Sequence, residues 1–299
     1  MSARHQPRIG LALGGGSARG WAHVGVIREL EAAGIRPDLV CGTSVGAMVG
    51  AAYAAGELDR FEQWLLDMSV SDVVSFMDVT LNGGVLKGDR LMDFFRRNFV
   101  DHPIENLAMP FAAVATSLRT GAEVWLREGS TVEAVRASIA LPVLFTPVQH
   151  DGLILVDGGL VNPVPVSLAR AMGADLVIAV DLNSDMLSRH EAADPPPEST
   201  ASPVGEWMRK LQVTLGLPLS EAASNEPKPP SLLDVVGSSI NIMQVRITRS
   251  RMAGEPADVV VAPRLAHFGL FVFHRAREAI DIGRRSVRTV LHQLSLLKE

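Results

Sequence analysis

The sequence predicts an α/β protein with three layers, in which helices cover both faces of a mostly parallel central sheet. The first fifty residues alternate short apolar runs, typical of buried strands, with longer segments whose apolar residues have helical spacing. Farther along the chain, the continuous apolar run Gly173–Leu182 has the composition of a strand in the middle of a parallel sheet. These two observations favour a doubly wound architecture.

The composition is that of a protein with a sizeable core. The chain has 299 residues, of which 47% are hydrophobic, enough for one large α/β domain or two small ones. Its formal net charge of −5 gives no basic surface of the kind that nucleic-acid-binding proteins need, so no nucleic-acid partner is expected. The single cysteine, Cys41, excludes an internal disulfide and a zinc site built from cysteines.

Nothing at the start of the sequence predicts export. Residues Met1–Arg8 are polar and lead into a short strand, so a cytoplasmic location is expected. The segment Leu39–Gly56 carries no charged residue, which satisfies one crude criterion for a membrane span. Because this segment is largely glycine and alanine, burial of a strand, a turn and a helix inside the domain is the preferred explanation.

The first structural unit is a strand, a glycine-rich loop and a helix. Arg8–Leu13 predicts a short buried strand that ends in the run Gly14–Gly20. A helix over Trp21–Ala33 then ends at Gly34, a residue type that adopts the left-handed C-terminal conformation easily. The next strand begins near Leu39, and a right-handed connection places the loops after both strands at the same edge of the sheet.

The loop after the second strand carries a candidate catalytic nucleophile. Gly42, Thr43, Ser44, Val45 and Gly46 form a Gly-x-Ser-x-Gly pattern between an apolar strand and a helix of small residues. A serine on such a sharp turn exposes its hydroxyl at the carboxyl edge of the sheet, and the tight turn requires small residues at Gly42 and Gly46. The same five-residue pattern also occurs by chance in loops rich in glycine and serine, so its context has to decide.

The glycine-rich loop does not fit a nucleotide-binding fingerprint. In the two possible registers of Gly-x-Gly-x-x-Gly, Arg19 replaces the third glycine or Ser17 replaces the second, and no Walker sequence follows. The backbone amides of Gly15, Gly16 and Ser17 could instead converge on an oxyanion, with Arg19 adding positive charge nearby. A purely structural role, in which the glycines let the helix pack close to the sheet, stays open.

The middle of the chain alternates further helices and strands. Helices are predicted over 58–68, 87–99 and 131–140, and strands over 111–116 and 122–126, with a hairpin turn between the two strands. One face of the helix over 87–99 carries four apolar residues. This face belongs either to the ordinary core or to the lining of an apolar substrate site. These residues are Leu91, Phe94, Phe95 and Phe99.

A second candidate catalytic residue is Asp157. It ends an apolar strand and is followed by Gly158 and Gly159, which let another loop approach. A buried carboxylate is costly unless it is hydrogen-bonded or takes part in chemistry. If this strand lies beside the strand that leads to Ser44, Asp157 can act as the general base for the serine. The alternative is that Asp157 only caps an Asp-Gly turn.

Together, the three motifs Gly14–Gly20, Gly42–Gly46 and Asp157–Gly159 resemble the patatin-like phospholipases, and within them the bacterial branch similar to neuropathy target esterase. The likeness covers about 8–181 and continues at 239–265 and 273–276. The sequence departs from the family at Ser17, where the glycine-rich motif usually has its last glycine. The Ser17 amide is therefore a less certain oxyanion donor than those of Gly15 and Gly16.

The resemblance implies a patatin-like fold and a Ser44–Asp157 dyad that cleaves acyl esters of lipids through an acyl-enzyme, without a metal or an organic cofactor. A triad would instead need a histidine, and His267 is the least unsuitable of the downstream candidates. His23 falls inside a helix on the far side of the glycine-rich loop. We therefore prefer the dyad.

The last third of the chain changes in composition. Proline-rich stretches frame a probable insert or lid at 184–230, in which an apolar row with four-residue spacing could cover an apolar site, touch a membrane or pack on the core. A C-terminal helical part at 231–299 follows, with a long helix, a strand at 257–261 and a final helix from about residue 271. The arginines of the final helix are either a solvated face or a contact for anionic lipid. The apolar row is Trp207, Leu211, Leu215 and Leu219.

The sequence therefore predicts a single patatin-like domain over 1–299 that acts on a lipid or another apolar acyl ester. A nucleotide-binding protein and a regulatory or scaffold protein with a vestigial hydrolase site are the alternatives. Peripheral contact with a membrane is left open, and the oligomeric state is not determined by the sequence.

Overall fold

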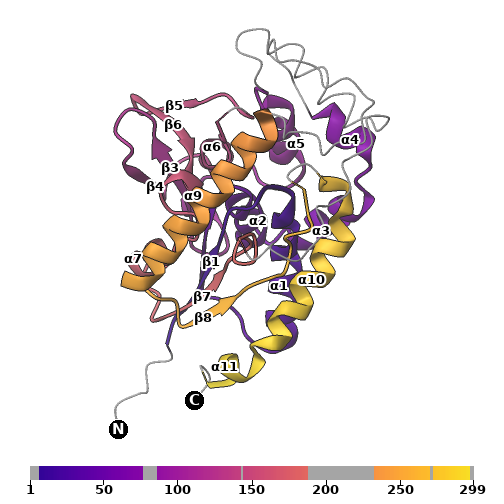
Figure 1. Ribbon diagram of the computed structural model, residues 1–299, viewed down its shortest axis with the longest axis vertical. Helices are drawn as coiled ribbons and strands as arrows, with labels where there is room; N and C mark the ends of the chain where they lie inside the picture. The colour runs from indigo at the N-terminus through magenta and orange to yellow at the C-terminus, as the bar shows by residue number, and fades with distance from the viewer. Residues whose placement is uncertain (1–6, 77–85, 143, 188–231, 270–271, 297–299) are drawn as a thin grey trace, which may run out of the picture.

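A computed structural model of the chain describes residues 7–76, 86–142, 144–187, 232–269 and 272–296 (Figure 1). Its centre is one sheet in which the strands follow the order β5-β6-β3-β2-β1-β7-β8, with β4 paired to β3. The strands are β1 (Ile9–Leu13), β2 (Leu39–Thr43), β3 (Phe111–Ser117), β4 (Glu123–Leu126), β5 (Val148–His150), β6 (Leu153–Asp157), β7 (Leu176–Val180) and β8 (Val259–Val261).

The sheet is mostly parallel. Strands β3, β2, β1, β7 and β8 pair in parallel, whereas β4 and β6 run antiparallel to β3 and β5 runs antiparallel to β6. The central strands are buried on both faces because helices cover them, which is why their sequences are continuous apolar runs. The predicted three-layer α/β class with a mostly parallel central sheet is confirmed.

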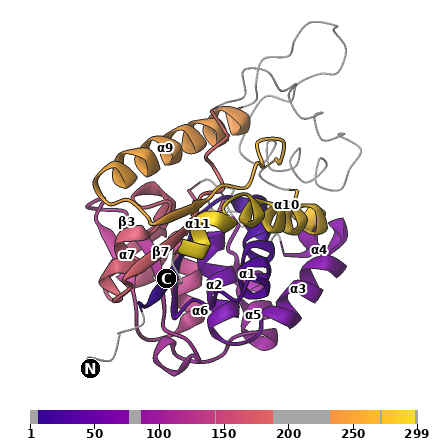
Figure 2. The same cartoon turned by 90° about the horizontal axis from the view of Figure 1, so that it is seen from below.

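Helices form the two outer layers (Figures 1 and 2). On one face, α1, α2 and α6 pack on the sheet, with α3, α5 and α10 outside them. On the other face, α7 packs on β1, β2 and β7, and α9 runs past the loop after β6. The helices are α1 (Ala22–Ala32), α2 (Val45–Ala54), α3 (Leu58–Asp67), α4 (Val70–Ser75), α5 (Asp89–Asn98), α6 (Thr131–Ser138), α7 (Val166–Ala171), α9 (Leu232–Gly254), α10 (Ala276–Thr289) and α11 (Leu291–Leu296).

The uncharged segment 39–56 is interior, as preferred from its composition. It forms β2, a turn and α2, and almost every residue in it is buried against neighbouring strands and helices. Within the described parts of the chain, we find no helix that combines the length and the apolar character needed to cross a bilayer.

Three short elements were not predicted: α4, β5 and α7. Helix α7 begins at Val166, directly after Pro165. The final helix also begins later than predicted. A single 3-10 turn over Phe273–Arg275 precedes α10, which starts at Ala276.

Helices α1 and α10 are in close contact through a glycine on each. A Cβ atom on Gly25 would lie 1.9 Å from the carbonyl oxygen of Ile280, and one on Gly283 would lie 2.1 Å from the carbonyl oxygen of Ala22. The backbones approach this closely because neither position carries a side chain.

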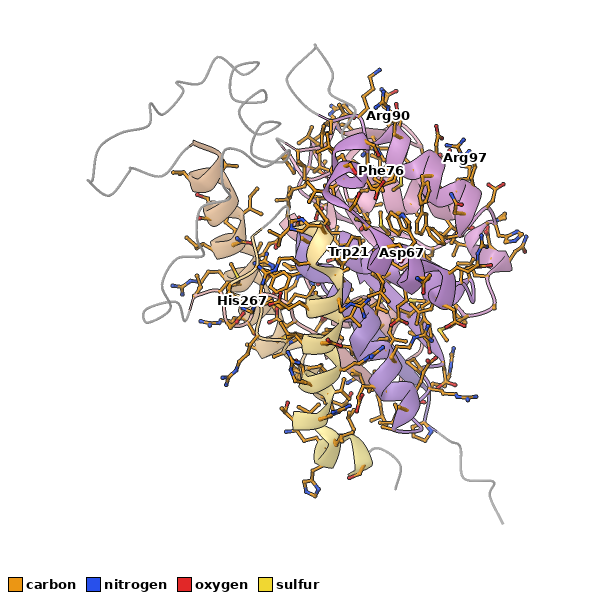
Figure 3. The ribbon with its side chains drawn as sticks, turned by 90° about the vertical axis from the view of Figure 1, so that its right-hand side faces the viewer. Trp21, Asp67, Phe76, Arg90, Arg97 and His267 are labelled. Atoms are coloured by element: carbon orange, nitrogen blue, oxygen red, sulfur yellow. The ribbon has the colours of Figure 1, made fainter. Side chains whose placement is uncertain are left out.

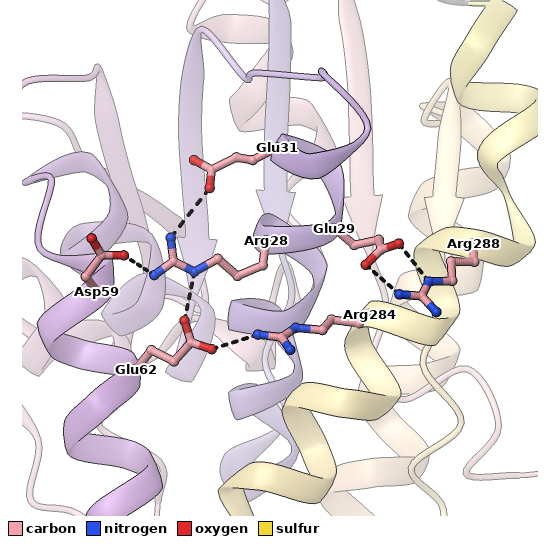
Figure 4. A network of polar contacts seen from close by, with 7 residues as sticks. All are labelled: Arg28, Glu29, Glu31, Asp59, Glu62, Arg284 and Arg288. Atoms are coloured by element: carbon pink, nitrogen blue, oxygen red, sulfur yellow. Dashed lines mark hydrogen bonds and ion pairs between the residues drawn. The ribbon is translucent and has the colours of Figure 1, made fainter.

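Ion pairs join the same two helices to each other and to α3 (Figure 4). Arg284 on α10 and Arg28 on α1 both bind Glu62 of α3, at 2.9 and 2.8 Å, and Arg288 on α10 binds Glu29 of α1 at 2.7 Å. These two arginines of the final helix are therefore held by carboxylates of the domain, an arrangement that neither sequence-based interpretation anticipated.

The predicted insert lies almost wholly outside the described residues, and so does its apolar row with Trp207. The division into one domain with an insert at 184–230 and a C-terminal part at 231–299 therefore stays a prediction. Strand β8 extends the central sheet by pairing with β7, so the C-terminal part contributes to the sheet as well as to the helical layers.

Candidate active site

Ser44 lies on a sharp turn between β2 and α2. Its φ of 56° and ψ of −128° place a non-glycine residue in a strained conformation, which the surrounding structure has to enforce. A Cβ on Gly42 would lie 2.3 Å from the backbone of Gly46, and one on Gly46 would lie 2.3 Å from the carbonyl oxygen of Leu13. Glycine at both positions is what allows the turn.

Two features fix the orientation of the Ser44 backbone. The residue precedes the first turn of α2, so the positive end of that helix faces it. Its own amide donates a hydrogen bond of 2.9 Å to Oγ of Ser138, a buried residue at the end of α6. Ser138 was not predicted as part of the site.

The structure brings Asp157 to Ser44. The serine hydroxyl donates a hydrogen bond of 2.6 Å to Oδ2 of the carboxylate, although the two residues are 113 positions apart. The other oxygen, Oδ1, accepts a bond of 2.7 Å from the amide of Gly159. A Cβ on Gly158 would lie 2.3 Å from the carbonyl oxygen of Val114, so this glycine lets the loop after β6 lie against β3.

The strand arrangement around Asp157 differs from the condition stated in the sequence analysis. Strand β6 does not lie beside β2, because β3 pairs with both and stands between them. Strand β6 also runs antiparallel to β3. The rule that parallel strands end at the same edge of a sheet therefore does not explain why the C-terminal end of β6 lies near Ser44. Asp157 is the last residue of β6 and pairs with Ala115 of β3, and its side chain bonds Ser44 across β3.

Burial controls the acidity of Asp157. The residue is fully buried, and this desolvation raises the pKa of its carboxyl from 3.8 to about 6, against the opposing effect of the bonds from Ser44 and Gly159. A carboxylate with a pKa close to neutrality is a better proton acceptor than an exposed one and is still ionised at pH 7.

The glycine-rich loop lies beside the serine. A Cβ on Gly15 would be 3.3 Å from Cβ of Ser44, so the loop passes close to the serine side chain. The Gly15 amide, predicted as an oxyanion donor, instead donates a bond of 2.9 Å to the carbonyl oxygen of Pro163. This part of the prediction is wrong for the observed conformation, because the N–H group is occupied by the loop that follows Asp157.

The next two residues, Gly16 and Ser17, line the same pocket as Ser44. Ser17 has a φ of 52°, a conformation in which glycine would be less strained. The flanking residues anchor the loop: Gly14 donates to the carbonyl oxygen of Val180 at 3.0 Å. A Cβ on Gly20 would lie 2.2 Å from Cγ1 of Val45, so this glycine allows contact with the start of α2.

Arg19 lines the same pocket as Ser44, and its role as a nearby positive charge stays a prediction. It is buried, and its Nε donates to the carbonyl oxygen of Gly16 at 3.0 Å. Its Nη2 donates to Oδ1 of Asn241 on α9 at 3.0 Å. The guanidinium group thus joins the glycine-rich loop to α9, in addition to lining the pocket.

Among the described residues, no histidine is hydrogen-bonded to Ser44 or Asp157. His267, considered for a triad, pairs with Glu278 at 3.3 Å. His23 is closer to the site than expected, since its Nε2 donates to the carbonyl oxygen of Gly14 at 2.7 Å, and burial lowers the pKa of the ring to about 4. Nor do three His, Cys, Asp or Glu side chains of the described ranges gather as metal ligands.

An apolar pocket of about 120 Å³ opens from Ser44. Trp21, Trp64 and Phe76 line it, and the Trp64 ring centroid lies 6.5 Å from that of Trp21 and 6.0 Å from that of Phe76; Figure 3 labels Trp21 and Phe76. Of the apolar face predicted on α5, Leu91 lines the pocket, whereas Phe95 and Phe99 are buried in the core. The prediction of ordinary core is confirmed for Phe95 and Phe99, and contact of Leu91 with a substrate stays a prediction.

Two buried amide side chains near the glycine-rich loop were not predicted as part of the site. They are Asn183 and Gln244. Asn183 follows β7 and contacts the carbonyl oxygen of Gly15, and Gln244 lies on α9 and lines the pocket. One signal could have found Asn183: like Ser44, it lies just after a strand of the parallel sheet, at the carboxyl edge where sites form. Gln244 has no comparable signal in the sequence.

Comparisons with known proteins agree on one family. A family model described as "Patatin-like phospholipase" matches residues 11–170. An uncharacterized NTE family protein of Mycobacterium tuberculosis is 32% identical, with 93% of this chain and 89% of that protein covered. Human patatin-like phospholipase domain-containing protein 6 is 38% identical over 59% of this chain and 13% of its own length. Lysophospholipase NTE1 of Pyricularia oryzae is 29% identical over 92% of this chain and 18% of its own length.

Proposed function

Because this chain belongs to the patatin-like phospholipase family and is a carboxylic ester hydrolase, we propose that it cleaves acyl esters of lipids with Ser44 as nucleophile and Asp157 as general base. The observation that carries this proposal is the direct bond of 2.6 Å from the Ser44 hydroxyl to the Asp157 carboxylate. Ser44 lines an apolar pocket, where an acyl chain can be held, and Asp157 is buried behind it.

The first step forms an acyl-enzyme. Asp157 accepts the hydroxyl proton while the Ser44 oxygen attacks the ester carbonyl, and the negative charge moves to the carbonyl oxygen. We assign the stabilisation of this oxyanion to the amide of Gly16, with the Ser17 amide next to it, because both residues line the pocket with Ser44 and the positive end of α2 faces the serine. Collapse of the intermediate breaks the ester bond, and the proton held by Asp157 passes to the departing alcohol.

The second step releases the acyl group. A water molecule enters where the alcohol left, Asp157 accepts its proton, and the hydroxide attacks the acyl carbonyl. When the second intermediate collapses, the proton returns to the Ser44 oxygen and the free carboxylic acid leaves. The same carboxylate therefore serves both halves of the cycle, which requires that it be ionised before each attack.

Labelling with a fluorophosphonate probe tests the nucleophile. Wild type should be labelled and should hydrolyse p-nitrophenyl esters, while Ser44→Ala should lose labelling and at least about a thousandfold of the hydrolysis rate. Asp157→Asn should lose most of both because the proton acceptor is gone. Ser286→Ala, which removes a hydroxyl on α10 that bonds only the carbonyl oxygen of Ile282, is the matched control and should behave as wild type.

Two results would contradict the proposal. Wild type could fail to react with either the probe or the esters under conditions in which it is folded. Ser44→Ala could keep its activity, which would place the nucleophile elsewhere. Hydrolysis of phospholipids and lysophospholipids, followed by mass spectrometry of the released acids, then identifies the lipid class.

A further inference from the structure

Three successive carbonyl oxygens of the glycine-rich loop are each held by a different side chain. His23 binds the oxygen of Gly14 at 2.7 Å, Asn183 binds that of Gly15 at 3.2 Å, and Arg19 binds that of Gly16 at 3.0 Å. All three side chains are buried. Glycines alone would leave these peptide units free to rotate, so the conformation of the loop depends on these partners.

The middle contact determines where the Gly16 amide points. The carbonyl group of Gly15 and the N–H group of Gly16 belong to the same planar trans peptide unit, in which they point in opposite directions. A bond that holds the Gly15 oxygen toward Asn183 therefore directs the Gly16 N–H away from it. Gly16 and Ser44 line the same pocket, and no acceptor for the Gly16 amide occurs among the described residues.

Asn183 is itself rigidly positioned. Its backbone amide donates to Oδ1 of Asp181 at 2.9 Å, which forms a tight turn directly after β7. Its side-chain nitrogen Nδ2 donates both to Gly15 and to Oε1 of Gln244 at 3.2 Å, so the two hydrogens of the amide have two acceptors. Gln244 belongs to α9, and the contact joins this helix to the loop.

We propose that Asn183 is a positioning residue for the oxyanion hole, and that Gln244 of α9 holds it in place. Asn183 does not touch the reacting atoms; it acts through the peptide unit between Gly15 and Gly16. The inference rests on the proposed function and extends it, because it makes the competence of the hydrolase site depend on a residue after β7 and on one from the C-terminal part of the chain.

The proposal predicts a particular kinetic signature. Stabilisation of the oxyanion is needed in the transition state but not for substrate binding, so the loss of Asn183 should lower kcat and leave KM within about twofold. Removal of a whole oxyanion donor costs about 100- to 1000-fold, and a misdirected donor should cost less, about 10- to 100-fold in kcat. Labelling by the fluorophosphonate probe should slow by a similar factor.

The experiment compares Asn183→Leu, which has a similar volume but no donor, with Asn183→Ser, which is smaller and more readily accommodated. Thermal melting identifies the variants that fold. The matched control is Asn98→Leu, because Asn98 also donates its side-chain amide to a backbone carbonyl, that of Phe94 at 2.8 Å, on α5. The control should keep the kcat of wild type.

A double-mutant cycle tests the link to α9. If Gln244 acts on the loop by holding Asn183, then Gln244→Met should lower kcat, and the double variant with Asn183→Leu should lose little more than Asn183→Leu alone. Additive losses would overturn this link.

Two further outcomes separate the inference from the function on which it rests. If wild type hydrolyses esters and a folded Asn183 variant keeps its kcat, or loses activity only through KM, the positioning role is wrong and the hydrolase assignment stands. If folded wild type neither hydrolyses esters nor reacts with the probe, the hydrolase function fails and the inference falls with it.

Discussion

The hydroxyl of Ser44 and the carboxylate of Asp157 are in direct contact at 2.6 Å, although the strands that carry them are not neighbours in the sheet. Strand β3 lies between β2 and β6, and the side chain of Asp157, the last residue of β6, reaches across it. Because the two side chains are in direct contact, the proposed mechanism makes activation of the serine depend on the ionisation of Asp157.

The first prediction concerns the pH dependence of hydrolysis. Asp157 must be ionised to accept a proton, and burial raises its pKa to about 6. We expect kcat/KM to fall as the pH drops through about 6, with one proton involved. A rate profile between pH 4.5 and 8.5 with a short-chain ester checks this. A midpoint close to 4 would mean that the carboxylate is better solvated than its burial indicates.

The second prediction concerns stability. A raised pKa means that the native state binds the proton more tightly than the unfolded chain does, so the stability of wild type falls as the pH rises through about 6. Asp157→Asn removes this cost. The variant should be more stable than wild type at pH 8, by up to about 3 kcal/mol, and the difference should shrink as the pH falls below 6.

Urea denaturation of wild type and variant at pH 5 and pH 8 measures this difference. Asp151→Asn is a suitable control, because the Asp151 side chain is 90% exposed. It should show no comparable gain at pH 8. A variant of Asp157 that is less stable than wild type at both pH values would indicate that the hydrogen bonds of the carboxylate outweigh the cost of burying its charge.

The third prediction concerns chain length. If the pocket holds the acyl chain, Leu91→Trp should fill part of it and reduce kcat/KM for a dodecanoyl ester by about 10-fold or more. Hydrolysis of a butyryl ester should change little. The same substitution at Leu118, which is 53% exposed and outside the pocket, serves as the control. Equal losses for both esters would show that the chain does not occupy this space.

The fourth prediction concerns the contact between α1 and α10. Gly283→Ala would place a Cβ 2.1 Å from the carbonyl oxygen of Ala22, and backbone atoms cannot move aside cheaply. We expect a loss of about 2–4 kcal/mol in the free energy of unfolding. Gly254→Ala, at the end of α9 with no atom within 4 Å of the new Cβ, should instead be neutral or slightly stabilising. Denaturation curves for the two variants give the comparison.

Much of the fold could be predicted because its signals are local. Each central strand is a short apolar run, and glycines mark the turns after β1 and β2. Ser44 and Asp157 could be singled out for the same reason, since each ends a strand and is followed by glycine within two residues. The assignment of catalytic roles to them stays a prediction that the labelling experiment tests.

What could not be predicted depends on contacts between distant parts of the chain. Nothing near Gly15 in the sequence shows that its amide binds Pro163, or that its carbonyl oxygen binds Asn183. The position of Arg19 depends on Asn241, more than two hundred residues later. Such pairings follow from strand order and helix packing, which short motifs do not encode.

The packing of α10 on α1 also bears on how the chain is synthesised. Strand β1 pairs with β2 on one side and with β7 on the other, and α1 meets α10 near the far end of the chain. While the ribosome is still making the middle of the protein, β1 therefore has an unpaired edge and α1 an uncovered apolar face. Strand β1 and helix α1 are therefore made well before the elements that complete their packing, and the face of α1 stays uncovered until residues 276–289 follow.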